Sequence, residues 1–190
     1  NVAAHNGGAI LSNAGTLSLA LVSMQNNSAQ NGGAVYGHAG LESTVDNCTF
    51  ILNYATKEMN YYDAAGGGAF YFWGSPTTCT VRGTTFLHNS AKTNGGAYVL
   101  NDYAKIEMSD VVVERNNATL VGGGSYIKNS GFNATNCTFK GNVAKVIMNP
   151  YDTAGGGAIY ATGLASYLSI DNSEFLANIA YTNGGALLAN

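Results

Sequence analysis

The acidic residues are the side chains of this sequence whose spacing could support catalysis. Pairs of carboxylates catalyse glycoside hydrolysis and, together with Arg or Lys, polysaccharide cleavage, but only where they converge on one face. The chain has eleven acidic residues. In the repeat described below, Asp46 and Asp171 share a position but lie four coils apart. Asp63 and Asp152 share another and lie three coils apart, about 14 Å, while Asp110 is alone on its coil face. We therefore predict no catalytic site and no enzyme, with a carbohydrate-active enzyme as the alternative.

The cysteines and histidines form no metal-binding pattern. No CxxC pair and no Cys/His cluster with ligand spacing occurs. The cysteines are predicted to be buried as small apolar side chains, and the histidines share no position in the repeat: Cys48, Cys79, Cys137, His5, His38 and His88. The glycine pairs lack the Lys-Ser/Thr that follows a phosphate-binding loop. We therefore predict no metal site and no cofactor.

Five Asn-x-Ser/Thr sequons, the acceptor sites of N-linked glycans, occur at Asn26, Asn47, Asn117, Asn133 and Asn136. Asn26 and Asn117 lie beside residues that the repeat places inward, so alternation predicts that they point outward. Asn47 and Asn136 lie three residues before an inward Phe and are also predicted to point outward. These four could carry glycans if the chain passes through a secretory pathway; the other interpretation is ordinary solvent-facing asparagine.

Composition excludes several classes of protein. Only 10% of the 190 residues are charged, against about 25% in a typical globular domain. The net charge is −3, and no basic run gives a footprint for nucleic acid. The sequence contains no run of about 18 apolar residues, so it predicts no membrane-spanning helix.

Two alternating motifs supply the elements that would position any site. Gly-Gly-Ala recurs along the whole chain, with its alanine at 9, 34, 69, 97, 158 and 186 and a serine in its place at 125. Each gap between these anchors holds an apolar residue, two others, Asn, one other and Ala. The apolar positions are Met24, Phe50, Phe86, Val113, Phe139 and Phe175. The Asn positions are Asn27, Asn53, Asn89, Asn116, Asn142 and Asn178.

A longer period contains these units. Residues 47–69 match residues 136–158 at an offset of 89, so three short units form one larger unit present in about two copies. The chain begins and ends inside repeats, and we expect residues 1–190 to be one segment of a longer array. The two long intervals hold similar inserts, which are candidate docking loops at Tyr62, Asp63, Tyr151 and Asp152.

A period of 25 to 35 residues, with short alternating apolar bursts, predicts an all-β fold. We predict a right-handed parallel β-helix of about seven coils, each with three short strands. The Phe column should face the core, and the Asn column should form a ladder of stacked amides at a turn. A repeat of this kind is stable only when its units stack.

Two apolar columns follow the anchor alanine, and alternation allows only one of them to face the core. The other is either an outer apolar stripe that packs on a neighbour or a sugar, or is covered by a loop. The first column is Ile10, Val35, Phe70, Tyr98, Tyr126, Ile159 and Leu187. The second is Leu11, Tyr36, Tyr71, Val99, Ile127, Tyr160 and Leu188.

The alternation of the two motifs, as in Gly7–Leu11 and Phe50–Asn53, resembles the GGAI and FxxN repeats of the chlamydial polymorphic outer-membrane proteins. The resemblance covers nearly the whole chain. It implies the parallel β-helix of an autotransporter passenger, exposed at a cell surface and acting as an adhesin.

These observations together predict a non-enzymatic structural or adhesive protein, a β-helical stalk or fibre subunit that is extracellular or on a cell surface. The expected partners are further copies stacked end to end or the rest of a longer parent chain, and also glycans or host-surface proteins. Nucleic acid and a direct membrane span are not expected.

Overall fold

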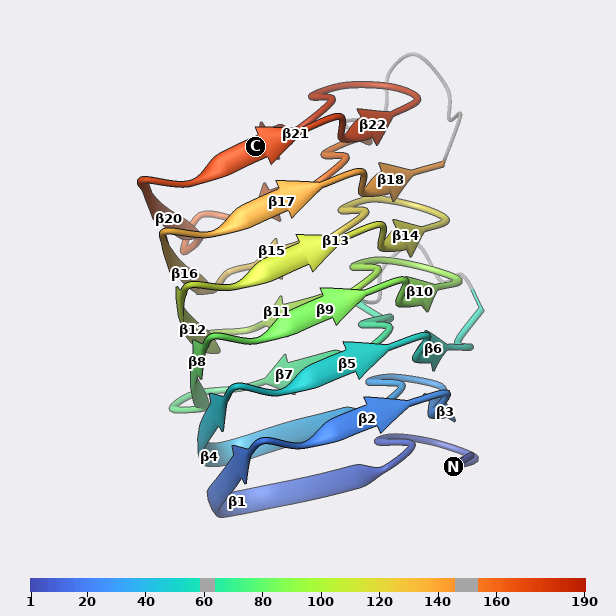
Figure 1. Cartoon of the computed structure of the whole chain (residues 1–190), viewed down its shortest axis with the longest axis vertical. Coiled ribbons are helices and arrows are strands. Elements are labelled where there is room, and N and C mark those ends of the chain that lie inside the picture. The colour runs from blue at the N-terminus through green and yellow to red at the C-terminus, as the bar shows by residue number, and fades with distance from the viewer. Residues whose placement is uncertain (59–63, 146–153) are drawn as a thin grey trace.

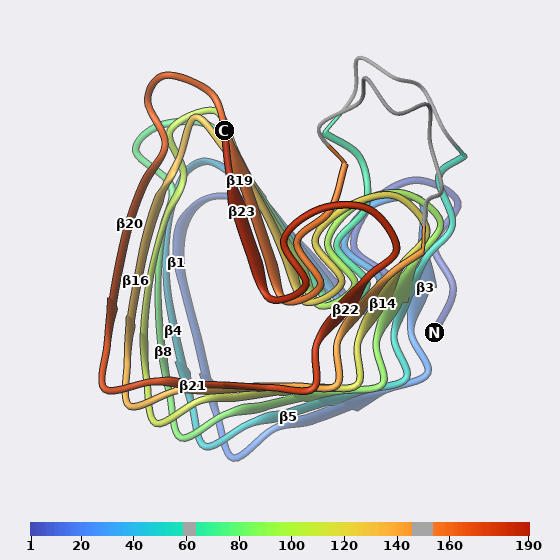
Figure 2. The same cartoon turned by 90° about the horizontal axis from the view of Figure 1, so that it is seen from above.

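The chain winds into a stack of similar coils in the computed structural model, which describes residues 1–58, 64–145 and 154–190 (Figure 1). All assigned elements of these ranges are β-strands, and every strand pairing is parallel. Viewed along the stacking axis, successive coils lie over one another (Figure 2). The predicted β-helix is therefore present, and equivalent residues form columns along one axis.

Each complete coil crosses four faces of the stack, with three strands in the first two coils and four in the later ones. The first two faces join into one 11-stranded sheet, because the long strands β1 (Ile10–Ala20) and β4 (Val35–Asp46) run through the corner between them. The remaining first-face strands are β7 (Phe70–Trp73), β11 (Tyr98–Asn101), β15 (Ser125–Lys128), β19 (Ile159–Thr162) and β23 (Leu187–Ala189). The remaining second-face strands are β8 (Thr78–Arg82), β12 (Lys105–Ser109), β16 (Gly131–Thr135) and β20 (Tyr167–Asp171).

The third and fourth faces are separate six-stranded sheets. The third contains β2 (Ser23–Gln25), β5 (Thr49–Ile51), β9 (Thr85–Leu87), β13 (Val112–Glu114), β17 (Thr138–Lys140) and β21 (Glu174–Leu176). The fourth contains the two-residue strands β3 (Ser28–Ala29), β6 (Tyr54–Ala55), β10 (Ser90–Ala91), β14 (Asn117–Ala118), β18 (Val143–Ala144) and β22 (Ile179–Ala180). The sequence predicted three strands per coil, and this fourth face is an addition.

The Phe column forms the centre of the core, as predicted. Phe50, Phe86 and Phe139 have no exposed surface, and the rings of Phe50 and Phe86 stack with centroids 5.2 Å apart. The strand register places the six predicted residues in one column on the third face. The coils thus bury a continuous apolar stack, and burial of this kind is the main driving force for folding.

The Asn column forms the predicted ladder of buried amides. In each rung both the backbone N–H and the side-chain Nδ2 donate to Oδ1 of the next Asn; for Asn53 and Asn89 these distances are 3.0 and 2.9 Å. The second Nδ2 hydrogen is given to a carbonyl oxygen of the Phe column in the preceding coil, as from Asn89 to Phe50 at 2.8 Å. The same pattern links the rungs up to Asn142 and Asn178. Each buried polar group of a rung therefore receives a partner.

Asn1 adds a rung that the motif search missed. Its Nδ2 donates to Asn27 Oδ1 at 2.9 Å, and its carbonyl oxygen accepts the N–H of Ser28. Val2 pairs with Ser28 as the fourth-face strands do. Residues 1–3, Asn-Val-Ala, therefore match the Asn-x-Ala half of the second motif.

The anchor of the fifth coil is displaced by one residue from its predicted register. Gly124, not Ser125, occupies the alanine position, because Ala97 N donates to Gly124 O and Gly124 N donates to Ala158 O. Ser125 then pairs with Tyr98 and Ile159, while Tyr126 pairs with Val99 and Tyr160. Ser125 therefore belongs to the inward column and Tyr126 to the outward one, which reverses the predicted sides of Tyr126 and Ile127.

The outward column of the first face is covered from Tyr36 to Tyr160, whereas Leu11 in the first coil is 54% exposed. Tyr36, Tyr71, Tyr126 and Tyr160 are each less than a tenth exposed and, with Val99, form a second apolar cluster. Two connecting-loop residues, Ala64 and Val121, pack against this cluster. Of the two alternatives open from the sequence, the structure therefore shows the stripe covered by loops. The inserts at Tyr62, Asp63, Tyr151 and Asp152 lie outside the described residues.

Candidate functional site

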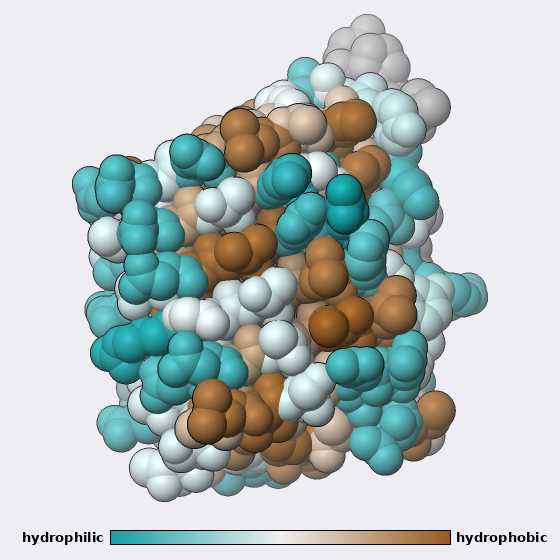
Figure 3. All heavy atoms as spheres, in the orientation of Figure 1, coloured by the Kyte–Doolittle hydropathy of each residue, from teal (hydrophilic) through white to brown (hydrophobic). Residues whose placement is uncertain are grey.

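The second face carries the polar side chains that chemistry or binding would use. Alternation turns Thr80, Glu107 and Asn133 outward from β8, β12 and β16, where they are cross-strand neighbours. The next outward row contains Arg82, Ser109 and Thr135. The third face is different, because apolar and polar side chains alternate there in small patches (Figure 3). The second face is therefore the best candidate for a site.

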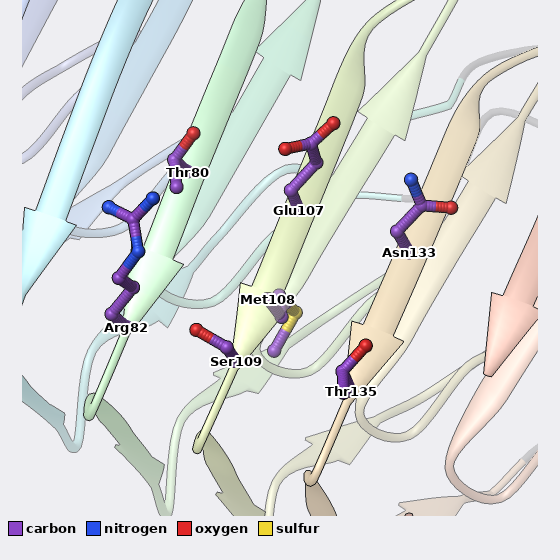
Figure 4. Close-up of a pocket in the computed structure, with 7 residues that line it drawn as sticks. All are labelled: Thr80, Arg82, Glu107, Met108, Ser109, Asn133 and Thr135. Atoms are coloured by element: carbon purple, nitrogen blue, oxygen red, sulfur yellow. The ribbon is translucent and has the colours of Figure 1, made fainter. Parts of the chain in front are cut away.

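A first hollow of about 320 Å³ lies over these two rows and includes part of Met108 in its wall. Figure 4 shows Thr80, Glu107 and Asn133 standing side by side on neighbouring strands, with Arg82, Ser109 and Thr135 one step further along. Arg82 Nη1 lies 3.6 Å from Asp46 Oδ1 at one side. The hollow can therefore offer hydrogen-bond donors and acceptors, one carboxylate and one shared guanidinium.

This arrangement lacks the carboxylate pair of a glycosidase. Glu107 is the one acid among the residues that line the first hollow. Asp46 and Asp171 share a column, as predicted, but the intervening rungs of that column separate them. Asp110 lies in a turn, where its Oδ1 accepts a hydrogen bond from Asn136 Nδ2. Within the described ranges, the acids singled out in the sequence are therefore not brought together.

A second hollow, of about 430 Å³, adjoins the first at the beginning of the same strands. Its walls include Tyr103 and Tyr167, which are 62% and 47% exposed, and its floor includes Gly131 between Lys105 and Tyr167. The remaining lining residues are Ser75, Pro76, Thr78, Asn129, Ser130 and Ala165. Tyr167 Oη donates to Asn133 Oδ1, so one hydrogen bond joins a wall of each hollow.

Sequence reasoning missed the residues of this second hollow. Their signal lies in the second-strand column, which reads Glu42, Thr78, Lys105, Gly131 and Tyr167 once the strands are aligned. The stretches differ so much in residue type that the repeat does not align them. Tyr103 precedes the strand in a turn and has no repeat signal of its own.

The sequons have different environments. Asn26, Asn47 and Asn136 are exposed at turns with φ values of 53°, 51° and 56°. Asn117 is half-buried, and its Oδ1 is buried without a hydrogen-bond partner among the described atoms. Asn117 alternates with Ala118, which has no exposed surface, in a strand whose neighbours are paired at Ser90 and Val143, and it is less exposed than the sequence predicted. Asn133 lines the first hollow.

The three cysteines are buried and unpaired, as the sequence predicted: Cys48, Cys79 and Cys137. Burial raises the pKa of the Cys79 thiol to about 12. Burial also raises the pKa of Cys137. The thiols of Cys79 and Cys137 are therefore protonated at neutral pH and are poor nucleophiles.

No group of three His, Cys, Asp or Glu side chains within the described residues has the geometry of a metal site. Over the same residues, no helix has the length and apolar character required to cross a membrane. His38 packs its ring against Trp73, with centroids 5.6 Å apart.

The comparisons with known proteins give one match. Residues 1–178 match the family described as "Right handed beta helix region". This match agrees with the parallel coils and supports the predicted right-handed winding. No curated protein and no solved structure matches the chain.

Proposed function

Because the chain belongs to the right-handed β-helix family, we propose that it is a non-enzymatic structural or adhesive protein of a cell surface or extracellular fibre. One observation carries this proposal: the Asn ladder continues from Asn1 to Asn178 without a missing rung. A solenoid whose neighbouring coils are joined in this way is stiff along its axis. Stiffness is the property that a stalk or a fibre subunit requires.

More specifically, we propose that the chain is a surface protein of the chlamydial polymorphic outer-membrane type. It is supported by the two motifs, GGA and Phe-x-x-Asn, which alternate through the chain. In this role the stack holds a binding face at a distance from the cell.

Glycosylation is a second feature of the proposed extracellular role. Asn26 and Asn47 are exposed at turns and offer room for a glycan. We expect both to be occupied when the chain is secreted from a eukaryotic cell, while the half-buried Asn117 is not. Peptide mass spectrometry before and after enzymatic deglycosylation measures each site, and full occupancy of Asn117 with neither of the others would contradict this expectation.

The proposed role is tested by locating and imaging the native protein. Antibodies to the chain should label intact, unpermeabilised cells, and electron microscopy should show straight rods or filaments. End-to-end filaments would identify a fibre subunit, and single rods a stalk. Label that appears only after permeabilisation would refute the surface role.

A carbohydrate-active enzyme is the second candidate. It is favoured by Glu107, which lies in a hollow with Arg82 and could act as an acid or base on a sugar. Incubation with polysaccharides and detection of new reducing ends or unsaturated products decides between the two. Products formed by the native chain and abolished by Glu107→Gln would favour the enzyme.

A further inference from the structure

We propose that the two hollows of the second face form one groove that binds an acidic oligosaccharide without cleaving it. Both hollows use successive outward positions of the same strands: Thr78, Thr80 and Arg82 on β8. The same holds for Lys105, Glu107 and Ser109 on β12. Outward positions of a parallel strand are about 6.6 Å apart, so the groove follows the strands across the stack.

The shape and lining of the second hollow suit a sugar ring. Tyr103 and Tyr167 present exposed aromatic surface, which can pack against the apolar C–H face of a sugar. Short polar side chains, including Thr78 and Asn129, stand near them and can bind hydroxyl groups. A mainly apolar wall with a few polar groups is the usual composition of a small-molecule site.

Gly131 in the floor of this hollow lets the side chains of Lys105 and Tyr167 lie close together over the backbone. A Cβ atom at this position would lie 2.9 Å from Lys105 Cγ and 3.3 Å from Tyr167 Cε1. The neighbouring coils carry Lys105 and Tyr167 at the same position, and the coil beyond Lys105 carries Thr78. The missing side chain therefore leaves backbone at the bottom, with Lys105 on one side and Tyr167 on the other.

Charge selects the kind of sugar. The two hollows contain two cations, Arg82 and Lys105, and one anion, Glu107. Arg82 is shared with Asp46, whereas no ion pair to Lys105 is found in the part of the chain that the structure describes. Because Asp46 balances Arg82, the local charges sum to zero, and the preference rests on the Lys105 ammonium, whose lack of an ion pair favours a carboxylate or sulfate carried by the sugar. The Lys105 ammonium would donate to that group.

This inference rests on the proposed adhesive role, because it names the class of ligand for that role. Its test uses the purified chain, made in a bacterial host so that no glycan on Asn133 covers the groove. Calorimetry with a uronic-acid tetramer and with the corresponding neutral tetramer should show about tenfold tighter binding of the acidic sugar. Lys105→Gln should remove this preference, so that the two tetramers bind with equal affinity.

Two further variants test the aromatic wall and the floor. Tyr103→Ala should weaken binding of both tetramers about tenfold. Gly131→Thr, which places a side chain of the Thr78 type on the floor, should abolish both. Circular dichroism confirms that each variant is folded. The matched controls are Lys140→Gln on the third face and Tyr181→Ala, whose ring is 59% exposed outside the groove.

Each other outcome overturns the proposal. Equal affinity for the two tetramers would refute the acidic class. Binding of neither, or binding of acidic or proline-rich peptides in their place, would refute the sugar. Cleavage of the tetramer would refute the non-catalytic role. Because these measurements use the chain in solution, their failure leaves the rod shape and surface location to be judged separately by imaging.

Discussion

Removal of one interior rung of the Asn ladder should cost far more stability than removal of the last. The side chain of Asn89 makes four hydrogen bonds: its Oδ1 accepts from N and Nδ2 of Asn53, and its Nδ2 donates to Phe50 O and to Asn116 Oδ1. Asn89 has no exposed surface, so water cannot replace these partners. At about 1 kcal/mol for each bond, Asn89→Ala should lower the free energy of unfolding by about 4 kcal/mol.

Asn178 is the matched control. Its side chain accepts from N and Nδ2 of Asn142 and donates to Phe139 O, but it is only partly buried. Water can satisfy the groups that Asn178→Ala leaves unpaired, so this change should cost about 1 kcal/mol. Equilibrium unfolding in urea, followed by circular dichroism and tyrosine fluorescence, gives both values. A loss for Asn89→Ala no larger than the small loss expected for Asn178→Ala would show that the ladder is not a source of stability.

Replacement of the same amide by a carboxyl adds a dependence on pH. In Asn89→Asp the side chain still accepts from Asn53, but when ionised it has no hydrogen to give to Phe50 O or Asn116 Oδ1. Burial and these two oxygens should raise the pKa of the new carboxyl above its unfolded value of about 3.9. The folded state then binds the proton more tightly, so stability is highest below pH 4 and falls as pH rises through the raised pKa. A variant whose stability rises over that interval would contradict this account.

Three further predictions concern packing, ionisation and backbone strain. Gly96→Ala should cost about 3 kcal/mol or more, because the new Cβ would lie 2.1 Å from Gly123 O; Gly185→Ala, with its nearest atom at 3.6 Å, should be nearly neutral in the same urea assay. The raised pKa of Cys79 should make stability fall between pH 9 and 12, and the slope should shrink in Cys79→Ala. Leu52→Gly should raise the melting temperature by relieving a left-handed residue (φ 56°), a gain of about 0.5–1 kcal/mol that a lower melting temperature would refute.

The columns of the core were predictable because their residue types repeat. The Phe column recurs with an Asn three residues later, as at Phe50, Phe86 and Phe139. Burial requires an apolar side chain at the first position and a hydrogen-bonded amide at the second in every coil. The ladder followed from the same reasoning, since stacked amides satisfy one another. The motif search missed Asn1 because the apolar half of its motif is absent from the sequence.

A second hydrogen-bonded ladder was missed because its chemistry can be supplied by several residue types. Thr84 Oγ1 donates to Arg82 O at 2.8 Å and accepts the N–H of Cys48 at 3.2 Å. In the same way, Ser173 Oγ donates to Asp171 O and accepts the N–H of Cys137. The column contains Cys48, Thr84, Val111, Cys137 and Ser173, so these hydrogen bonds are interrupted at Val111 and no single residue type marks the column in the sequence. The groove residues Tyr103 and Lys105 were missed for the opposite reason, since they belong to one coil only.

The register error at Ser125 shows how a neighbouring coil decides what a motif cannot. Residues 122–125 read Gly-Gly-Gly-Ser, and the sequence alone allows either Gly124 or Ser125 to take the alanine position. The inward site of the adjacent coil holds Tyr98, which has no exposed surface. Ser125 lies beside Tyr98 and Tyr126 turns outward, so the core receives one large and one small side chain in successive coils. The predicted register would have placed the large side chains of Tyr98 and Tyr126 side by side in the core. Volume across the stack, which a motif along the chain does not record, therefore selects the register.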